Sequence, residues 1–144
     1  MKKLRRTEDE RQPIALNHIA IKSKQVEVLS DFYRRVLELP LLKTFKDENG
    51  LRSIWLSLGT SILMLERSDY DEDKASTRTG FFVDKPGYHL LAFTVSIEKQ
   101  SVLRASLHDL EIKIEHESEY TIYFRDPDGN RIGLSNLDVS SVKN

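Results

Sequence analysis

The amino-acid sequence repeats one order of predicted elements, and this repeat constrains the fold more than any other feature. Each half of the chain starts with a strand-like run, continues with a helix-like run and ends with three more strand-like runs. In the first half we expect strands at 16–21, 41–45, 51–58 and 61–66 and a helix at 26–37. In the second half we expect strands at 88–95, 112–115, 120–124 and 130–135 and a helix at 97–110. Two β-α-β-β-β modules therefore predict an α+β fold with curved mixed sheets.

Turn signals and an acidic segment set the boundaries of the two modules. Asn49-Gly50 is typical of a hairpin turn, and Pro40 ends the first helix. The acidic segment 68–74 interrupts the pattern, and 81–83 predicts a small packed element after it. The first helix carries one apolar stripe, formed by Val26, Leu29, Phe32, Tyr33, Val36 and Leu37. We expect tails at 1–13 and 138–144 and one domain at 14–137, with modules at 14–66 and 88–137 and a linker at 67–87.

Composition excludes several classes of function. The 22 basic and 23 acidic residues give a net charge of −1, so the chain lacks the positive charge that nucleic-acid binding requires. The absence of cysteine excludes disulfides, a thiol nucleophile and cysteine-based metal sites. No apolar run reaches the length of a membrane span, and the basic residues near Met1 precede no apolar signal region. We expect a cytoplasmic protein without nucleic-acid or membrane partners.

Three polar side chains recur at matched places of the repeat and have the chemistry of metal ligands. His18 and His89 lie in the first strand of their modules, and Glu66 ends the last strand of module one. Two imidazoles and one carboxylate form a facial triad that leaves positions open for substrate. The alternatives are a hydrogen-bonded core histidine and a carboxylate facing water. Because equivalent positions of a repeat converge about a pseudo-twofold axis, the metal triad is the hypothesis we test.

The third strand of each module supplies candidate pocket residues. Trp55 and Tyr123 occupy corresponding places in the repeat and would form an aromatic wall for a flat or amphipathic ligand. Arg52 and Arg125 lie in the same strands and suit a carboxylate or a phosphate. Core aromatics and surface ion pairs are the alternative interpretations of these residues.

Several motifs follow one another along the repeat. They are Asn17-His18-Ile19-Ala20-Ile21, Asp31-Phe32-Tyr33-Arg34-Arg35-Val36-Leu37, Leu63-Met64-Leu65-Glu66, Gly87-Tyr88-His89-Leu90-Leu91-Ala92 and Tyr123-Phe124-Arg125-Asp126-Pro127-Asp128-Gly129-Asn130-Arg131-Ile132. In this order they resemble the vicinal oxygen chelate superfamily, which includes glyoxalase I, methylmalonyl-CoA epimerase, bleomycin- and fosfomycin-resistance proteins and extradiol dioxygenases. The resemblance extends from about residue 15 to 137.

The resemblance implies a metal site with one ligand from the first and one from the last strand of each module. By position, His18, Glu66 and His89 match three ligands of a divalent Zn, Ni, Fe, Mn or Co ion. The fourth place is a glutamate in glyoxalase-like members, where it is both ligand and general base. Here it is Gly133, which removes the base and predicts extra room on one side of the site. Candidate side chains to fill that room are Glu117, Glu119 and Tyr123, and no catalytic residue is assigned.

The resemblance leaves two main functions. The first is a glyoxalase-like lyase, isomerase or dioxygenase that holds a small oxygen-rich substrate on a divalent metal. The alternative is a metal-free protein that binds or sequesters a small molecule, as bleomycin-resistance proteins do. A former enzyme with a structural role is a third. The resemblance also implies a homodimer.

Overall fold

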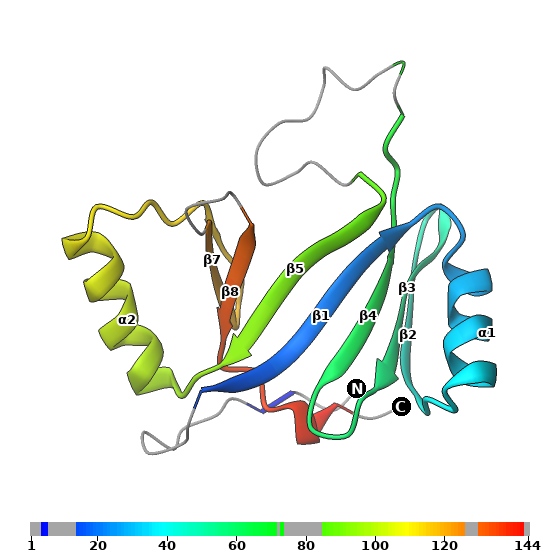
Figure 1. The fold of residues 1–144 in the computed structure, drawn as a ribbon, viewed down its shortest axis with the longest axis horizontal. Helices are drawn as coiled ribbons and strands as arrows, with labels where there is room; N and C mark the ends of the chain where they lie inside the picture. The colour runs from blue at the N-terminus through cyan, green and yellow to red at the C-terminus, as the bar shows by residue number, and fades with distance from the viewer. Residues whose placement is uncertain (1–3, 6–13, 72, 74–84, 126–129, 143–144) are drawn as a thin grey trace.

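The computed structural model describes residues 4–5, 14–71, 73, 85–125 and 130–142 (Figure 1). Its elements follow the predicted order of two β-α-β-β-β repeats. The first repeat contains β1 (Ala15–Ser23), α1 (Val26–Val36), β2 (Leu41–Asp47), β3 (Gly50–Ser57) and β4 (Ile62–Arg67). The second contains β5 (Gly87–Thr94), α2 (Ile97–Asp109), β6 (His116–Glu117), β7 (Thr121–Arg125) and β8 (Arg131–Ser135), followed by the 3-10 helix η3 (Val139–Ser141).

All eight strands form one curved sheet, so the predicted α+β fold is confirmed. The strand order is β2-β3-β4-β1-β5-β8-β7-β6. Within each repeat the first strand pairs in parallel with the last, β1 with β4 and β5 with β8. The repeats meet where β1 and β5 pair antiparallel. This central antiparallel pair relates the two halves of the sheet by a pseudo-twofold axis (Figure 1).

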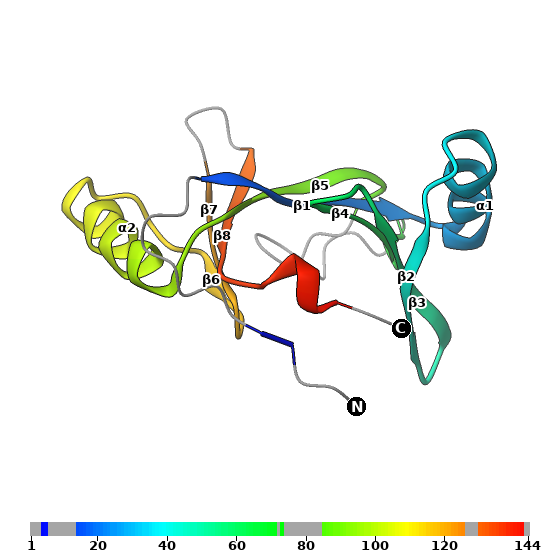
Figure 2. The same ribbon diagram turned by 90° about the horizontal axis from the view of Figure 1, so that it is seen from below.

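The helices pack on the convex face of the sheet, one near each end. Val26, on α1, belongs to a buried cluster with Leu56 and Leu65 of β3 and β4. Leu107, on α2, belongs to a second cluster with Ile122 and Leu134 of β7 and β8. Figure 2 shows the middle of this face, over β1 and β5, lying between the two helices. Leu91 of β5, which projects from this face, is 38% exposed.

The concave face carries the third cluster, and the chain covers it with its own C-terminal segment. Ala20, Met64 and Ala92 of the sheet pack with Leu137 and Val142, which are 4% and 3% exposed. Figure 2 shows η3 inside the curve of the sheet. The prediction of a tail from residue 138 is therefore wrong for residues 138–142. The apolar Leu137 and Val142 flank a polar 3-10 turn, a pattern too short for periodicity to detect.

The N-terminal tail is also ordered in part. Leu4 packs against the concave cluster, and the Arg5 backbone N–H donates to Ser141 Oγ at 3.0 Å. The Asp138 backbone N–H donates to the Arg5 carbonyl at 2.8 Å. Leu4 and Arg5 thus lie against the C-terminal segment, whereas residues 6–13 are outside the described part of the chain.

Two further expectations need correction. The apolar stripe predicted for the first helix includes Phe32, Val36 and Leu37, but each of these side chains is more than half exposed. The stripe is narrower because α1 covers only one edge of the sheet. The strand predicted at 112–115 begins only at β6, because the Ile112 N–H donates to the Leu107 carbonyl and continues the end of α2.

The element predicted at 81–83 and the turn at 126–129 lie outside the described residues. No helix among the described residues is long and apolar enough to cross a membrane.

Candidate functional site

The pairing of β1 with β4 sets the spacing between His18 and Glu66. His18 lies opposite Ile62, whereas Glu66 lies opposite Lys22. By strand alternation both side chains project from the concave face. Along the strand direction, however, His18 and Glu66 are four residues apart. At about 3.3 Å per residue this separation is about 13 Å, which is too far for two ligands of one ion.

His18 is held in one tautomer by its neighbour. The Asn17 side-chain amide donates to Thr94 Oγ1 and to the Leu137 carbonyl, both at 2.9 Å. The Asn17 oxygen is therefore the acceptor for His18 Nδ1 at 2.7 Å, so Nδ1 carries the proton and Nε2 the lone pair. Burial lowers the pKa of His18 from 6.5 to about 4. His18 is thus a neutral imidazole at neutral pH, as a metal ligand is, and equally as a core histidine is.

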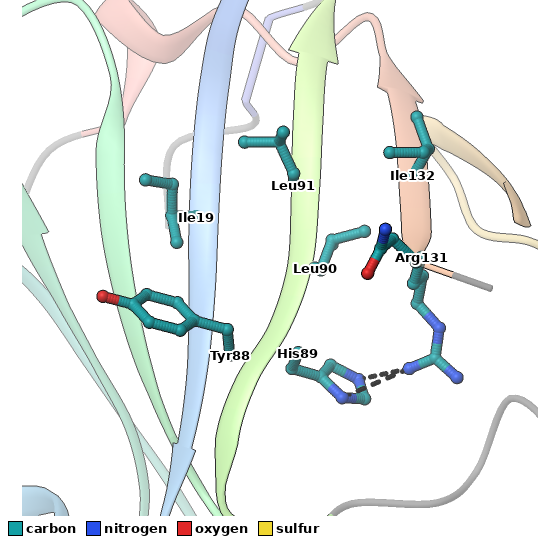
Figure 3. Close-up of a pocket in the computed structure, with 8 residues that line it drawn as sticks. Ile19, Tyr88, His89, Leu90, Leu91, Arg131 and Ile132 are labelled. Atoms are coloured by element: carbon teal, nitrogen blue, oxygen red, sulfur yellow. Dashed lines mark hydrogen bonds between the residues drawn. The ribbon is translucent and has the colours of Figure 1, made fainter. Parts of the chain in front are cut away.

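His89 lies at an irregularity in the central strand pair. Leu90 is opposite Ala20 and Tyr88 is opposite Ile21, so β5 carries one extra residue, His89, between them. Arg131 Nη1 lies 2.6 Å from His89 Nε2 and 3.2 Å from Nδ1 (Figure 3). Because a guanidinium only donates hydrogen bonds, the contacted ring nitrogen of His89 is an acceptor. That lone pair points to a cation rather than toward His18.

These three side chains are not brought together as one donor set. Among the described residues, no group of three or more His, Cys, Asp or Glu side chains is arranged to hold a metal ion. Glu66 is displaced along the sheet from His18, and the positive charge of Arg131 beside His89 opposes binding of a divalent cation there. The donors therefore do not fit a single divalent metal as they are placed. The metal triad stays a prediction from sequence, without geometric support.

The pairing register of β1 with β5 also changes which residues of the two repeats are equivalent. Across the pseudo-twofold axis, His18 pairs with Ala92 and Ala20 pairs with Leu90. If the two alanines are counterparts, the counterpart of His18 is Leu90 and not His89. By the same register, His89 at the irregularity of β5 matches Asn17 at the irregularity of β1. A sequence comparison without register cannot detect this correspondence.

The last strands of the two repeats show the same offset. Ala20 lies opposite Met64 of β4, and Ala92 lies opposite Gly133 of β8, so Met64 and Gly133 are counterparts. By the same register, Ser135 is the counterpart of Glu66. The Met64 and Gly133 positions thus carry a thioether and a hydrogen. Neither supplies a carboxylate to the concave face.

Trp55 and Tyr123 do occupy corresponding places, as predicted. Trp55 lies opposite Met64, and Tyr123 lies opposite Gly133. Both are half-buried and pack against the concave cluster. Trp55 also donates to Ser53 Oγ at 3.0 Å, and its ring centroid is 4.7 Å from that of Phe45. Their role as a pocket wall stays a prediction, since their described contacts are those of core aromatics.

The extra room expected beside Gly133 is absent, and this expectation is wrong. A Cβ at Gly133 would lie 2.9 Å from Thr121 Cγ2, 3.2 Å from Ala92 Cβ and 3.4 Å from Leu90 Cδ1. Neighbouring side chains already fill the space that a side chain would need. Here glycine permits close packing of β8 against its neighbours rather than opening a site.

The remaining candidate side chains lie apart from one another. Arg52 is exposed on β3, and Glu119 is exposed beside β7. Arg125 pairs with Glu115, and Glu117 accepts a hydrogen bond from Arg104 at 2.7 Å. The structure therefore does not join these residues into one polar site.

A pocket that the sequence analysis missed lies beside β1, β5 and β8, with Ile19, Leu91 and Ile132 on the convex face and Leu90 and Arg131 on the opposite face by strand alternation. Its cavity volume is about 360 Å³. It is lined by Ile19, Tyr88, His89, Leu90, Leu91, Asn130, Arg131 and Ile132 (Figure 3). The segment containing His89 and Leu91 was singled out as a motif, but the convex orientation of its apolar residues depends on the register with β1 and β8.

Known proteins share this fold. The family profile of the Glyoxalase/Bleomycin resistance protein/Dioxygenase superfamily matches residues 15–134. No protein of curated function matches the sequence significantly.

One similar solved structure is the hypothetical protein BH1468 from Bacillus halodurans C-125. The match has 17% sequence identity and a TM-score of 0.62, and it covers 86% of this chain and 94% of that chain. Methylmalonyl-CoA epimerase from Mycobacterium tuberculosis matches with 22% sequence identity and a TM-score of 0.59. This match covers 84% of this chain and 86% of that chain. A variant of homoprotocatechuate 2,3-dioxygenase from B. fuscum matches at 18% identity, 85% of this chain and a TM-score of 0.65, but this chain spans only 33% of the dioxygenase. At these identities the structures share the fold alone. From the profile match and the fold together, the chain belongs to the Glyoxalase/Bleomycin resistance protein/Dioxygenase superfamily.

Proposed function

We propose that this chain is a metal-free small-molecule-binding protein of its superfamily. The observation that carries the proposal is the placement of His89, whose imidazole accepts a hydrogen bond from Arg131 and forms no three-donor group with His18 and Glu66 in the described part of the chain. The predicted facial triad requires three protein ligands on one ion, and the described residues offer no group of three His, Cys, Asp or Glu side chains that could hold it.

Two features of the concave face support this proposal. Gly133 supplies no general base, and Thr121, Ala92 and Leu90 leave no room for one. The C-terminal segment packs Leu137 against the same face. The pocket beside β1, β5 and β8, in contrast, has the size and the largely apolar lining of a small-molecule site.

Metal titration with a parallel ligand screen tests the proposal. We expect calorimetry with Zn²⁺, Ni²⁺, Mn²⁺ and anaerobic Fe²⁺ to show no stoichiometric binding that a His18→Ala/His89→Ala variant loses. We expect a small-molecule fragment screen, followed by protein NMR in EDTA, to find ligands whose affinity does not change when metal is added. About one metal ion per chain, lost in the double variant, would contradict the proposal.

The second candidate function is a glyoxalase-like metal-dependent enzyme, and one observation favours it. The Asn17 oxygen accepts from His18 Nδ1 and leaves the Nε2 lone pair available, which is how an outer-shell partner orients a ligating histidine. The elemental content of protein purified without chelators distinguishes the two candidates.

A homodimer is also part of the proposal. Exposed apolar residues of and beside α1, among them Phe32, Val36 and Leu37, support an association between chains. Light scattering of the purified chain at several concentrations tests it.

A further inference from the structure

Helix α1 carries an apolar stripe that the sheet does not cover. Val28, Phe32 and Val36 follow one another at intervals of four residues, so they lie along one side of the helix. Their exposed fractions are 58%, 55% and 60%. Other positions, among them Val26 and Leu29, make the contact of α1 with the sheet. The apolar surface of α1 is thus wider than the sheet buries.

The second helix has no comparable stripe. Val102 and Leu110 are 60% and 69% exposed, but the exposed position between them on the same side of α2 is Ser106. Figure 1 and Figure 2 show α1 and α2 at opposite ends of the molecule. Of the two helices, α1 is therefore the one with a continuous apolar surface for another molecule.

Charged side chains follow one flank of this stripe. Glu27, Asp31 and Arg35 are exposed, and each directly precedes a residue of the stripe. Because each residue of a helix turns the chain by about 100°, the three lie on the same side of it. The other flank, which includes Leu29 and Tyr33, packs against the sheet. The open flank is thus acidic in the first half of α1 and basic at Arg35.

A second copy of α1, turned about a two-fold axis, complements both the stripe and its flank. In an antiparallel pair with Phe32 at the axis, Val28 of each copy lies opposite Val36 of the other. This symmetry also brings the same flank of both helices side by side. Asp31 of each copy then lies beside Arg35 of the other, in two equivalent ion pairs at the rim of an apolar contact. A parallel pair would place this flank against the sheet-facing side of the other helix and form neither ion pair.

We propose that two copies of this chain associate through α1, packed antiparallel about a two-fold axis at Phe32. This inference rests on the homodimer proposed above and names its interface, and it does not depend on whether the chain binds metal. With 11 residues, α1 is about 16 Å long. A contact of this length is small for a protein–protein interface, so we expect the dimer to dissociate on dilution.

Sedimentation velocity of the full chain at several concentrations tests the interface. Phe32→Glu should raise the dissociation constant of the dimer by about tenfold or more, because it places like charges opposite each other at the axis. The matched control is Val102→Glu on α2, which should leave the equilibrium unchanged. Circular dichroism checks that each variant is folded, and Val36→Glu repeats the test at another exposed position of the stripe if Phe32→Glu is not.

Exchange of the flanking charges tests the antiparallel orientation. Asp31→Arg and Arg35→Asp should each weaken self-association at low ionic strength, because like charges then meet on the flank. A mixture of these two variants should form heterodimers in native mass spectrometry, because each new charge then lies opposite its complement in the other copy. An effect of the substitutions within one helix would not produce this preference.

The possible failures are distinguishable. If the chain is a monomer at every concentration, the homodimer and this interface are both wrong. If the chain dimerises and the folded stripe variants dimerise equally well, the homodimer stands and this interface is wrong. If the stripe variants weaken the dimer but the mixed charge variants form no heterodimers, the antiparallel packing is wrong.

Discussion

His18 makes the stability of the folded chain depend on pH. Its pKa falls from 6.5 to about 4 because burial disfavours the charged imidazolium. Above pH 6.5 both folded and unfolded states carry neutral His18, and its contribution is constant. Between pH 6.5 and 4 the unfolded chain binds a proton and the folded chain does not. The free energy of unfolding should therefore fall as the pH is lowered, by about 3 kcal/mol in total from this group.

Urea unfolding at intervals between pH 7 and 4 measures this dependence. A His18→Gln variant should lose the His18 part of the slope, whereas His108→Gln should keep it, because the His108 side chain is 90% exposed. An NMR titration that placed the pKa of His18 near 6.5 would contradict the assignment.

Gly133 is required by close packing, so we expect substitution to destabilise the fold. In Gly133→Ala the new methyl would lie 2.9 Å from Thr121 Cγ2, and the strands must shift to admit it. Overpacking of this kind costs about 1–3 kcal/mol in the free energy of unfolding. Chemical denaturation measures the loss, and Thr121→Ser in the same chain should recover part of it by removing the methyl group. Unchanged stability of Gly133→Ala would show that the site has the room predicted from sequence.

At the scale of elements, the C-terminal segment is part of the core. Leu137 is 4% exposed, packs on the concave cluster, and accepts a hydrogen bond from Asn17 through its carbonyl. Truncating a buried leucine typically costs about 2–5 kcal/mol, so we expect Leu137→Ala to lower the free energy of unfolding by that amount.

The matched control for this variant is Leu110→Ala, since Leu110 is 69% exposed at the end of α2. It should change the free energy of unfolding by no more than about 0.5 kcal/mol. Equal effects of the two substitutions in thermal or urea unfolding would mean that the segment does not stay docked in solution.

At the scale of the whole molecule, pairing of β1 with β5 joins the two repeats into one sheet. The concave cluster draws residues from both repeats, so this part of the core is incomplete in either repeat alone. We expect one cooperative unfolding transition. The fluorescence of Trp55, the single tryptophan, reports on the first repeat, and the methyl NMR signal of the buried Ile122 reports on the second. Both probes, together with circular dichroism, should give the same midpoint in urea. Separate midpoints would show that the repeats fold independently.

Periodicity in the sequence determined most of the elements and their order. The repeat predicted β1 to β5, β7, β8 and both helices, because alternation and helical spacing are local properties of a chain. The correspondence of Trp55 with Tyr123 followed from the same repeat and is confirmed by the register. Predictions failed where an element depends on a distant partner. Ile112 is still hydrogen-bonded to the end of α2, so the strand predicted at 112–115 begins only at His116, and Leu137 is buried by a face that the local sequence does not reveal.

The candidate site depended on tertiary structure far more than the fold did. The sequence identified His18, Glu66 and His89 as chemically suitable donors, but it carries no record of strand register. One extra residue in β5 moves His89 against Arg131, and the β1–β4 register displaces Glu66 along the sheet from His18. Because side chains alternate between faces along a strand, a shift of one residue decides which face a side chain occupies. The family and the fold were thus determined by the sequence, whereas only the assembled sheet decided which side chains meet.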